Sequence, residues 1–198
     1  MTTEDGAGPH GALPGETEWD GETYQRRFDD LARSGVDVHG EVDFVMGYAP
    51  DAVLDAGCGT GRVAAELDRR GVEVVGIDRD ASMIATARAM APGVEFHVGD
   101  VASTEIGRTF PLVVMAGNVP LFTPEGTQAA LVAGCARHLG SAGLLVAGFQ
   151  LGRGYPVERY DADCRAAGLE FVARWSTWDG DRFDPAGGYA VSVHRLTT

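Results

Sequence analysis

Apolar positions along the chain follow two alternating patterns. Runs rich in apolar and β-branched residues at 53–56, 72–78, 94–101, 111–118 and 144–149 predict strands. The run at 111–118 is fully apolar before its last residues, as in strands covered on both faces, which lose the alternation of half-exposed ones. Apolar residues spaced three and four apart predict helices at 22–33, 39–48, 62–69, 124–138 and 156–167. Strands that alternate with helices are typical of βαβ units and a parallel sheet.

The last part of the chain has a different pattern. Residues 169–178 and 189–196 are strand-like, and Asp179-Gly180 between them is typical of a turn, which predicts a closing hairpin. Residues 1–17 are rich in Gly, Pro, Thr and Glu and predict a flexible tail. The 198-residue length suits one doubly wound α/β domain over residues 18–198.

The richest short pattern joins the first strand to the helix that follows it. Asp55 stands inside the apolar run, and Gly57, Gly59 and Gly61 then occupy alternate positions. Glycine lacks Cβ, so the backbone can bend sharply at a strand end while a flat ligand lies directly against it. The pattern predicts a nucleoside-binding loop with Cys58 inside it, where the small side chain packs and does not react.

The glycine spacing separates two classes of nucleoside site. Dinucleotide-binding folds use G-x-G-x-x-G, in which the third glycine lets a helix N-terminus approach a pyrophosphate. Here the spacing is G-x-G-x-G, and Arg62 occupies the position of the last dinucleotide glycine. The spacing therefore argues against a pyrophosphate.

Two acidic residues end later strands. Asp78 closes the second predicted strand, where a carboxylate can accept hydrogen bonds from both hydroxyls of a ribose. Arg79 leaves the nucleoside open, since it could hold the 2′-phosphate of NADP or lie along an adenine face. Asp100 closes the third strand and is followed by Val101.

Together these segments resemble the class I S-adenosylmethionine-dependent methyltransferases, whose first motif matches residues 53–61. The resemblance covers about residues 38–196. It implies a Rossmann-like doubly wound sheet of about seven strands, mostly parallel with an antiparallel C-terminal strand and with helices on both faces. It also implies that Asp100 accepts a hydrogen bond from the adenine amino group and that the Val101 backbone N–H reaches a ring nitrogen.

The remaining site residues follow from the same resemblance. The small residues after the fourth strand leave room for the methionine end of the cofactor, although Pro111 stands where this family commonly has Asp. The segments before the first strand cover the acceptor pocket in this family, which makes Tyr24 and His39 the candidates for catalysis. The cofactor-binding residues expected are Tyr24, Asp55, Gly57, Cys58, Gly59, Gly61, Asp78, Arg79, Met83, Asp100, Val101, Ala116, Gly117 and Asn118.

Composition narrows the partners. The formal net charge of −13 repels a nucleic-acid backbone, and no Arg-rich stripe with interleaved aromatics is present. Asn118-Val119-Pro120-Leu121 also lacks the Asn-Pro-Pro-Tyr arrangement of methyltransferases that act on DNA or RNA bases. We expect a small-molecule acceptor and no nucleic-acid partner.

Cysteine usage and hydropathy bear on location. Cys58, Cys135 and Cys164 are odd in number, widely spaced and without a C-x-x-C pair, which argues against disulfides and a metal site. No run of 18 apolar residues and no signal peptide is found, so we expect a cytoplasmic protein without a membrane span.

The function predicted is S-adenosylmethionine-dependent methyl transfer to a small molecule, with the acceptor atom open between O, N and C. Two alternatives remain at this point. An NADP-dependent oxidoreductase is favoured by Asp78-Arg79 and opposed by the glycine spacing and Asp100. A protein that binds the cofactor without transferring methyl is compatible with the absence of a clear general base in the sequence.

Overall fold

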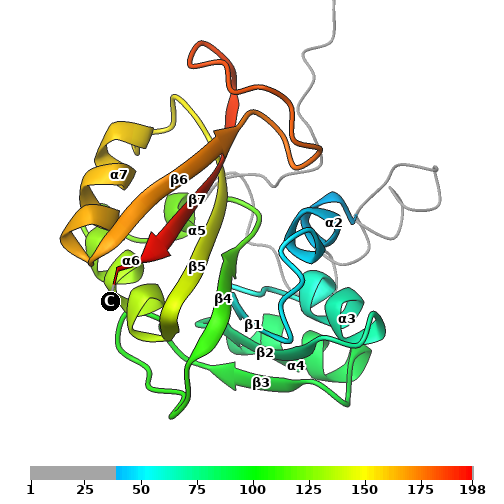
Figure 1. Ribbon diagram of the computed structural model, residues 1–198. Helices are drawn as coiled ribbons and strands as arrows, with labels where there is room; N and C mark the ends of the chain where they lie inside the picture. The colour runs from blue at the N-terminus through cyan, green and yellow to red at the C-terminus, as the bar shows by residue number, and fades with distance from the viewer. Residues whose placement is uncertain (1–38, 198) are drawn as a thin grey trace, which may run out of the picture.

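The structure is a computed structural model that describes residues 39–197. A seven-stranded sheet forms its centre, in the order β3-β2-β1-β4-β5-β7-β6 (Figure 1). The strands are β1 (Ala52–Ala56), β2 (Glu73–Asp78), β3 (Glu95–Val98), β4 (Phe110–Met115), β5 (Leu139–Gln150), β6 (Leu169–Trp175) and β7 (Tyr189–Leu196). Neighbours from β3 to β5 pair in parallel, and β7 runs antiparallel to both β5 and β6. The predicted fold class is confirmed.

Helices cover both faces of the sheet. One face carries α2 (Gly40–Met46), α3 (Arg62–Arg69) and α4 (Ala81–Met90), and the other carries α5 (Val119–Phe122), α6 (Gln128–Arg137) and α7 (Val157–Ala166) (Figure 1). No helix within residues 39–197 has the length and apolar composition needed to cross a bilayer. The predicted tail 1–17, the predicted helix 22–33 and Tyr24 lie outside the described residues.

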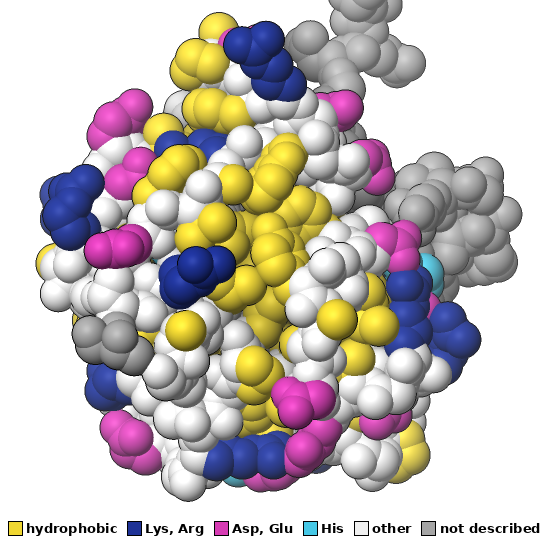
Figure 2. All heavy atoms as spheres, viewed as in Figure 1, with side chains coloured by type: hydrophobic (Ala, Val, Ile, Leu, Met, Phe, Trp, Pro, Cys, Tyr) yellow, Lys and Arg dark blue, Asp and Glu magenta, His cyan; other side chains and the backbone are white. Residues whose placement is uncertain are grey.

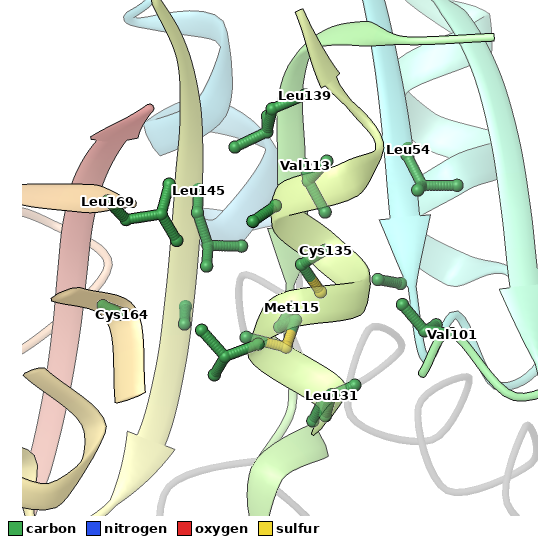
Figure 3. Close-up of a cluster of buried hydrophobic side chains, with 14 of the residues drawn as sticks. Leu54, Val101, Val113, Met115, Leu131, Cys135, Leu139, Leu145, Cys164 and Leu169 are labelled. Carbon is green, nitrogen blue, oxygen red and sulfur yellow. The ribbon is translucent and has the colours of Figure 1, made fainter. Parts of the chain in front are cut away.

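Alternate side chains of each central strand enter opposite cores. On β4, Val113 and Met115 pack on the α6 side, whereas Leu112 and Val114 pack on the α3 side. Figure 3 shows the first of these cores, in which Leu131 and Cys135 of α6 face side chains of β1, β4 and β5. Burial on both faces explains why these strands appear in the sequence as unbroken apolar runs.

On one face of the molecular surface, hydrophobic and charged side chains lie in different regions. In the view of Figure 2, hydrophobic side chains form a band down the middle of the face, over the region of β4 and β5, and charged side chains gather toward its margin. Figure 1 shows the same orientation, with the helices of the two layers on either side of these strands.

The strand order places a crevice at one point of the sheet. The chain adds β2 and then β3 on one side of β1, and returns to add β4 on the other side. Connections that leave in opposite directions open a gap at the carboxyl ends of the strands, where open α/β sheets bind ligands. The gap lies beyond the carboxyl ends of β1 and β4.

Several predicted boundaries differ from the structure. Pro111 is the second residue of β4 and not the first, and the register with β5 shifts between Phe110 and Leu112, so the exposed proline lies at an irregularity where a missing N–H is tolerated. The helix predicted from residue 124 begins at Gln128, after the separate turn α5. The strand predicted to reach residue 178 ends at Trp175.

Gly76 on β2 provides a test of the packing under the glycine loop. A Cβ at this position would lie 2.5 Å from the Phe96 ring and 3.0 Å from Cys58 Sγ. Because inserting a methyl group into a full core forces its neighbours to move, Gly76→Ala should lower the free energy of unfolding by about 1–3 kcal/mol in urea titrations. Gly93→Ala is the matched control, since its Cβ would meet nothing within 4 Å. Equal stability of the two variants would contradict this account.

Candidate functional site

The loop between β1 and α3 is held in a sharp turn by backbone hydrogen bonds. The N–H groups of Gly57 and Cys58 both donate to the Ile77 carbonyl, at 2.8 and 3.1 Å. Gly57, Gly59 and Gly61 all have positive φ values, of +78°, +55° and +78°. L-residues with a Cβ adopt this region only under strain, so each position favours glycine.

The three glycines also differ in what a side chain at each position would contact. A Cβ at Gly57 would lie 2.7 Å from both γ-carbons of Val119, and one at Gly61 would lie 2.9 Å from Ala87 Cβ and Phe96 Cζ. A Cβ at Gly59 would meet nothing within 4 Å. Gly57 and Gly61 therefore allow protein elements to pack closely, while Gly59 leaves bare backbone facing open space.

Asp78 connects this loop to the end of β2. Its Oδ2 accepts the Gly59 N–H at 2.9 Å, and its Oδ1 accepts the Asp80 N–H at 2.9 Å. Burial raises the pKa of Asp78, and the two backbone N–H groups act in the opposite direction because they stabilise the charged form. Asp78 thus fixes the position of Gly59 from the neighbouring strand.

A cavity of about 330 Å³ opens beside the loop at the carboxyl ends of β1, β2 and β4. This volume is within the range of small-molecule sites. The predicted residues that line it are Asp55, Gly57, Cys58, Gly59, Asp78, Arg79, Met83, Asp100, Val101, Ala116 and Gly117.

Three predicted residues within the described chain do not line the cavity. Gly61 is the N-cap residue of α3, where a Cβ would meet Ala87 and Phe96. Asn118 is fully buried, and its Oδ1 accepts the Gln150 N–H at 2.7 Å, so it ties the end of β4 to the end of β5. His39 precedes α2 at its N-cap position. Contacts of these three with a ligand stay predictions.

The sequence reasoning missed about half of the cavity wall. The additional residues are Thr60, Arg62, Val63, Ile77, Asp80, Gly99, Val119, Phe122, Thr123, Pro124 and Leu131. Most of them neighbour a predicted residue along the chain. Phe122 to Pro124 form a separate wall at the end of α5. The apolar stretch from Val119 to Phe122, after the fourth strand, is the sequence signal that could have indicated it.

Charged groups at the loop are partly paired. Arg62 forms a two-point ion pair with Glu41 of α2, at 2.6 and 3.1 Å, with both side chains largely buried. Next to it, Asp55 is 1% exposed, and its Oδ2 has no hydrogen-bond partner within the part of the chain that the structure describes. Burial raises the pKa of Asp55 from its ordinary 3.8 to about 7, although the nearby Arg62 acts to lower it.

Cys58 does not have the environment of a reactive thiol. Burial raises its pKa well above the ordinary range, and the nearby Asp55 and Asp78 add to the effect. A thiol that stays protonated is a poor nucleophile. The position of Cys58 between two glycines is consistent with packing.

Three comparisons show what the chain is similar to. Residues 53–143 match a family described as "Methyltransferase domain". The chain also resembles the crystal structure of a TehB-like S-adenosylmethionine-dependent methyltransferase from Corynebacterium glutamicum, with a TM-score of 0.84 and 34% identity over 90% of this chain and 98% of that one.

Curated relatives match over shorter stretches. A trans-aconitate 2-methyltransferase from Methylobacterium nodulans is 33% identical over 65% of this chain and 48% of its own length. A magnesium-protoporphyrin O-methyltransferase from Rhodobacter capsulatus is 38% identical over 37% of this chain and 35% of its own length. The chain thus spans about half or less of the length of these relatives.

The raised pKa of Asp55 predicts a pH-dependent stability. An acid with a higher pKa in the folded state favours folding while protonated, and this contribution is lost as the pH rises from 3.8 to about 7. The free energy of unfolding should therefore fall over this range more steeply in the unliganded wild type than in Asp55→Asn. Urea unfolding at several pH values measures both slopes. Asp51→Asn, at an exposed aspartate before β1, controls for loss of charge, and parallel curves for wild type and Asp55→Asn would refute the assignment.

Proposed function

Because the chain belongs to the class I S-adenosylmethionine-dependent methyltransferases, we propose that it transfers the methyl group of S-adenosylmethionine to a small-molecule acceptor. The observation that supports this most strongly is the glycine-floored cavity, into which Asp55, Asp78 and Asp100 converge from three strand ends. The match over 98% of the Corynebacterium glutamicum protein supports the same activity.

The residues present fit this cofactor in two ways. No protein atom lies within 4 Å of the place where a Cβ at Gly59 would be, so the backbone there is open to the cavity. A flat nucleoside needs such bare backbone to lie against. The unpartnered, buried Oδ2 of Asp55 lines the same cavity, and a buried acceptor of this kind is stabilised by a donor or cation from a ligand. The ammonium group of S-adenosylmethionine is a hydrogen-bond donor and carries a positive charge.

We assign binding of the ribose to Asp78 and binding of the adenine to Asp100. Each oxygen of Asp78 already accepts one backbone N–H and keeps a second lone pair, so the carboxylate can accept ribose hydroxyls without releasing Gly59. Asp100 is exposed at the end of β3, with Oδ1 held by the Ala102 N–H at 2.8 Å. This position suits the exocyclic amine of adenine.

The cofactor supplies an activated methyl group on a sulfonium. The protein then has to bind, orient and exclude water, and orientation alone contributes up to roughly 7–11 kcal/mol in favourable intramolecular models. Tyr24 and His39 remain our candidates for contacting the acceptor. His39 stands at the N-cap position of α2, and Glu41 of the same helix pairs with Arg62 at the cavity.

We further propose that the acceptor is a small molecule and not a nucleic acid. The two curated relatives described above are named for trans-aconitate and for magnesium-protoporphyrin. Since the chain spans only part of those proteins, we do not assign either acceptor to it. A cytoplasmic location likewise stays a prediction, based on the sequence.

Calorimetric titration separates the candidate cofactors. S-adenosylhomocysteine should bind at one site, and NADP(H) should not compete. Binding of NADP(H) alone would overturn the proposal in favour of an oxidoreductase. Incubation with methyl-labelled S-adenosylmethionine and a panel of small amines, hydroxyls and carboxylates then distinguishes transfer from binding without transfer, since only an enzyme releases a labelled acceptor.

Asp78→Ala tests the ribose assignment. The substitution leaves the ribose hydroxyls without their acceptor and the Gly59 N–H without its partner, so S-adenosylhomocysteine binding should weaken by about 1–3 kcal/mol, as measured by calorimetry. Asp68→Ala, at an exposed position of α3, is the matched control and should bind as the wild type does. Unchanged affinity of Asp78→Ala would show that the nucleoside lies elsewhere.

A further inference from the structure

Two walls of the cavity come from segments that are far apart in the sequence. Arg79, Asp80 and Met83 line it from the start of α4, whereas Phe122 and Thr123 line it from the end of α5. The Arg79 side chain spans the gap between them, because its Nη2 donates to the Phe122 carbonyl at 3.1 Å. The two walls are therefore joined at this point by a side chain.

The two ends of α5 are attached differently. At its beginning, the Asn118 N–H donates to the Gly148 carbonyl at 3.2 Å and Asn118 Oδ1 accepts from Gln150, so this end is fixed to β5. Val119 also packs where Gly57 lacks a side chain. Both anchors involve buried backbone of the sheet and loop, and neither reaches the end of the helix.

The far end of α5 leaves carbonyl groups that need partners outside the helix. Thr123 Oγ1 satisfies the Val119 carbonyl at 3.1 Å, and Arg79 satisfies that of Phe122. Phe122 is half-buried and Arg79 is exposed, so this contact lies at the solvent side of the cavity. One exposed side-chain hydrogen bond therefore joins the outer wall to the loop after β2.

We propose that Arg79 is a positioning residue that closes the nucleoside cavity by tying the loop after β2 to the end of α5, and so sets how long the nucleoside stays bound. This inference rests on the proposed function for the identity of the ligand. It differs from a role in which Arg79 only lies along the adenine, because Arg79 Nη2 donates to the Phe122 carbonyl of the chain itself.

Hydrogen exchange of the ligand-free protein tests the tie itself. Arg79→Met keeps the approximate length of the side chain and removes its donors. The amides of the non-proline residues in 119–124 should then exchange about 3- to 10-fold faster, the factor expected for one lost hydrogen bond. Arg79→Lys keeps a donor and the charge and should retain most of the protection. Unchanged exchange in Arg79→Met would overturn the tie.

A matched control is available on α4. Arg88 makes the same kind of bond, from its guanidinium to the Phe96 carbonyl at 2.6 Å, and does not line the cavity. Arg88→Met should leave exchange at residues 119–124 as it is in the wild type. A rise equal to that of Arg79→Met would show a general loosening and would overturn the specific role of Arg79.

The dissociation rate of S-adenosylhomocysteine, measured by stopped-flow displacement, tests the consequence. It should rise about 3- to 10-fold in Arg79→Met, remain near the wild-type rate in Arg79→Lys, and not change in Arg88→Met. Faster exchange with an unchanged dissociation rate would overturn the effect on ligand lifetime. If the wild type does not bind S-adenosylhomocysteine, the proposed function fails, while the exchange experiment still decides whether the tie exists.

Discussion

The hydrogen bond from the Gly59 N–H to the Asp78 carboxylate is the constraint on which the candidate site depends. It joins the turn after β1 to the end of β2, and the Ile77 carbonyl holds the preceding two N–H groups of the same turn. Because the glycines have no side chains to fix them, their positions are set by these bonds to the neighbouring strand. The cavity floor is thus as rigid as the pairing of β1 with β2.

The opposite side of the cavity is organised on a different principle. Its wall is the short helix α5, fixed at one end to β5 through Asn118 and joined at the other to Arg79. A rigid floor with a wall held by one exposed contact allows a ligand to enter without disturbing the sheet. Regions with few buried contacts open at low free-energy cost, whereas central strands do not.

The fold could be predicted because its main signals are local. Strands buried on both faces appear as apolar runs, and alternation with helices then implies the parallel order. The position of Pro111 inside β4 and the beginning of α6 were less predictable. A proline has the same local sequence whether it begins a strand or lies at an irregularity within one. The place of Pro111 depends on the pairing of β4 with β5, which no short segment encodes.

The site shows the same division. Asp78, Asp100, Gly57 and Gly59 lie on the cavity because they end or closely follow strands, and strand ends meet at one edge of a parallel sheet. Asn118 also follows a strand, but its left-handed backbone turns the side chain toward Gln150. Phe122 and Thr123 reach the cavity from a turn with no strong motif, so only the tertiary structure identifies them.

The placement of β7 between β5 and β6 has a consequence for folding during translation. Synthesis produces β5 and β6 first, and each lacks its neighbour until residues 189–196 have emerged and inserted between them. Two open strand edges are therefore exposed on the nascent chain at the same time, and such edges readily pair with other polypeptides. Protection of this half of the sheet during translation would fall to cellular chaperones.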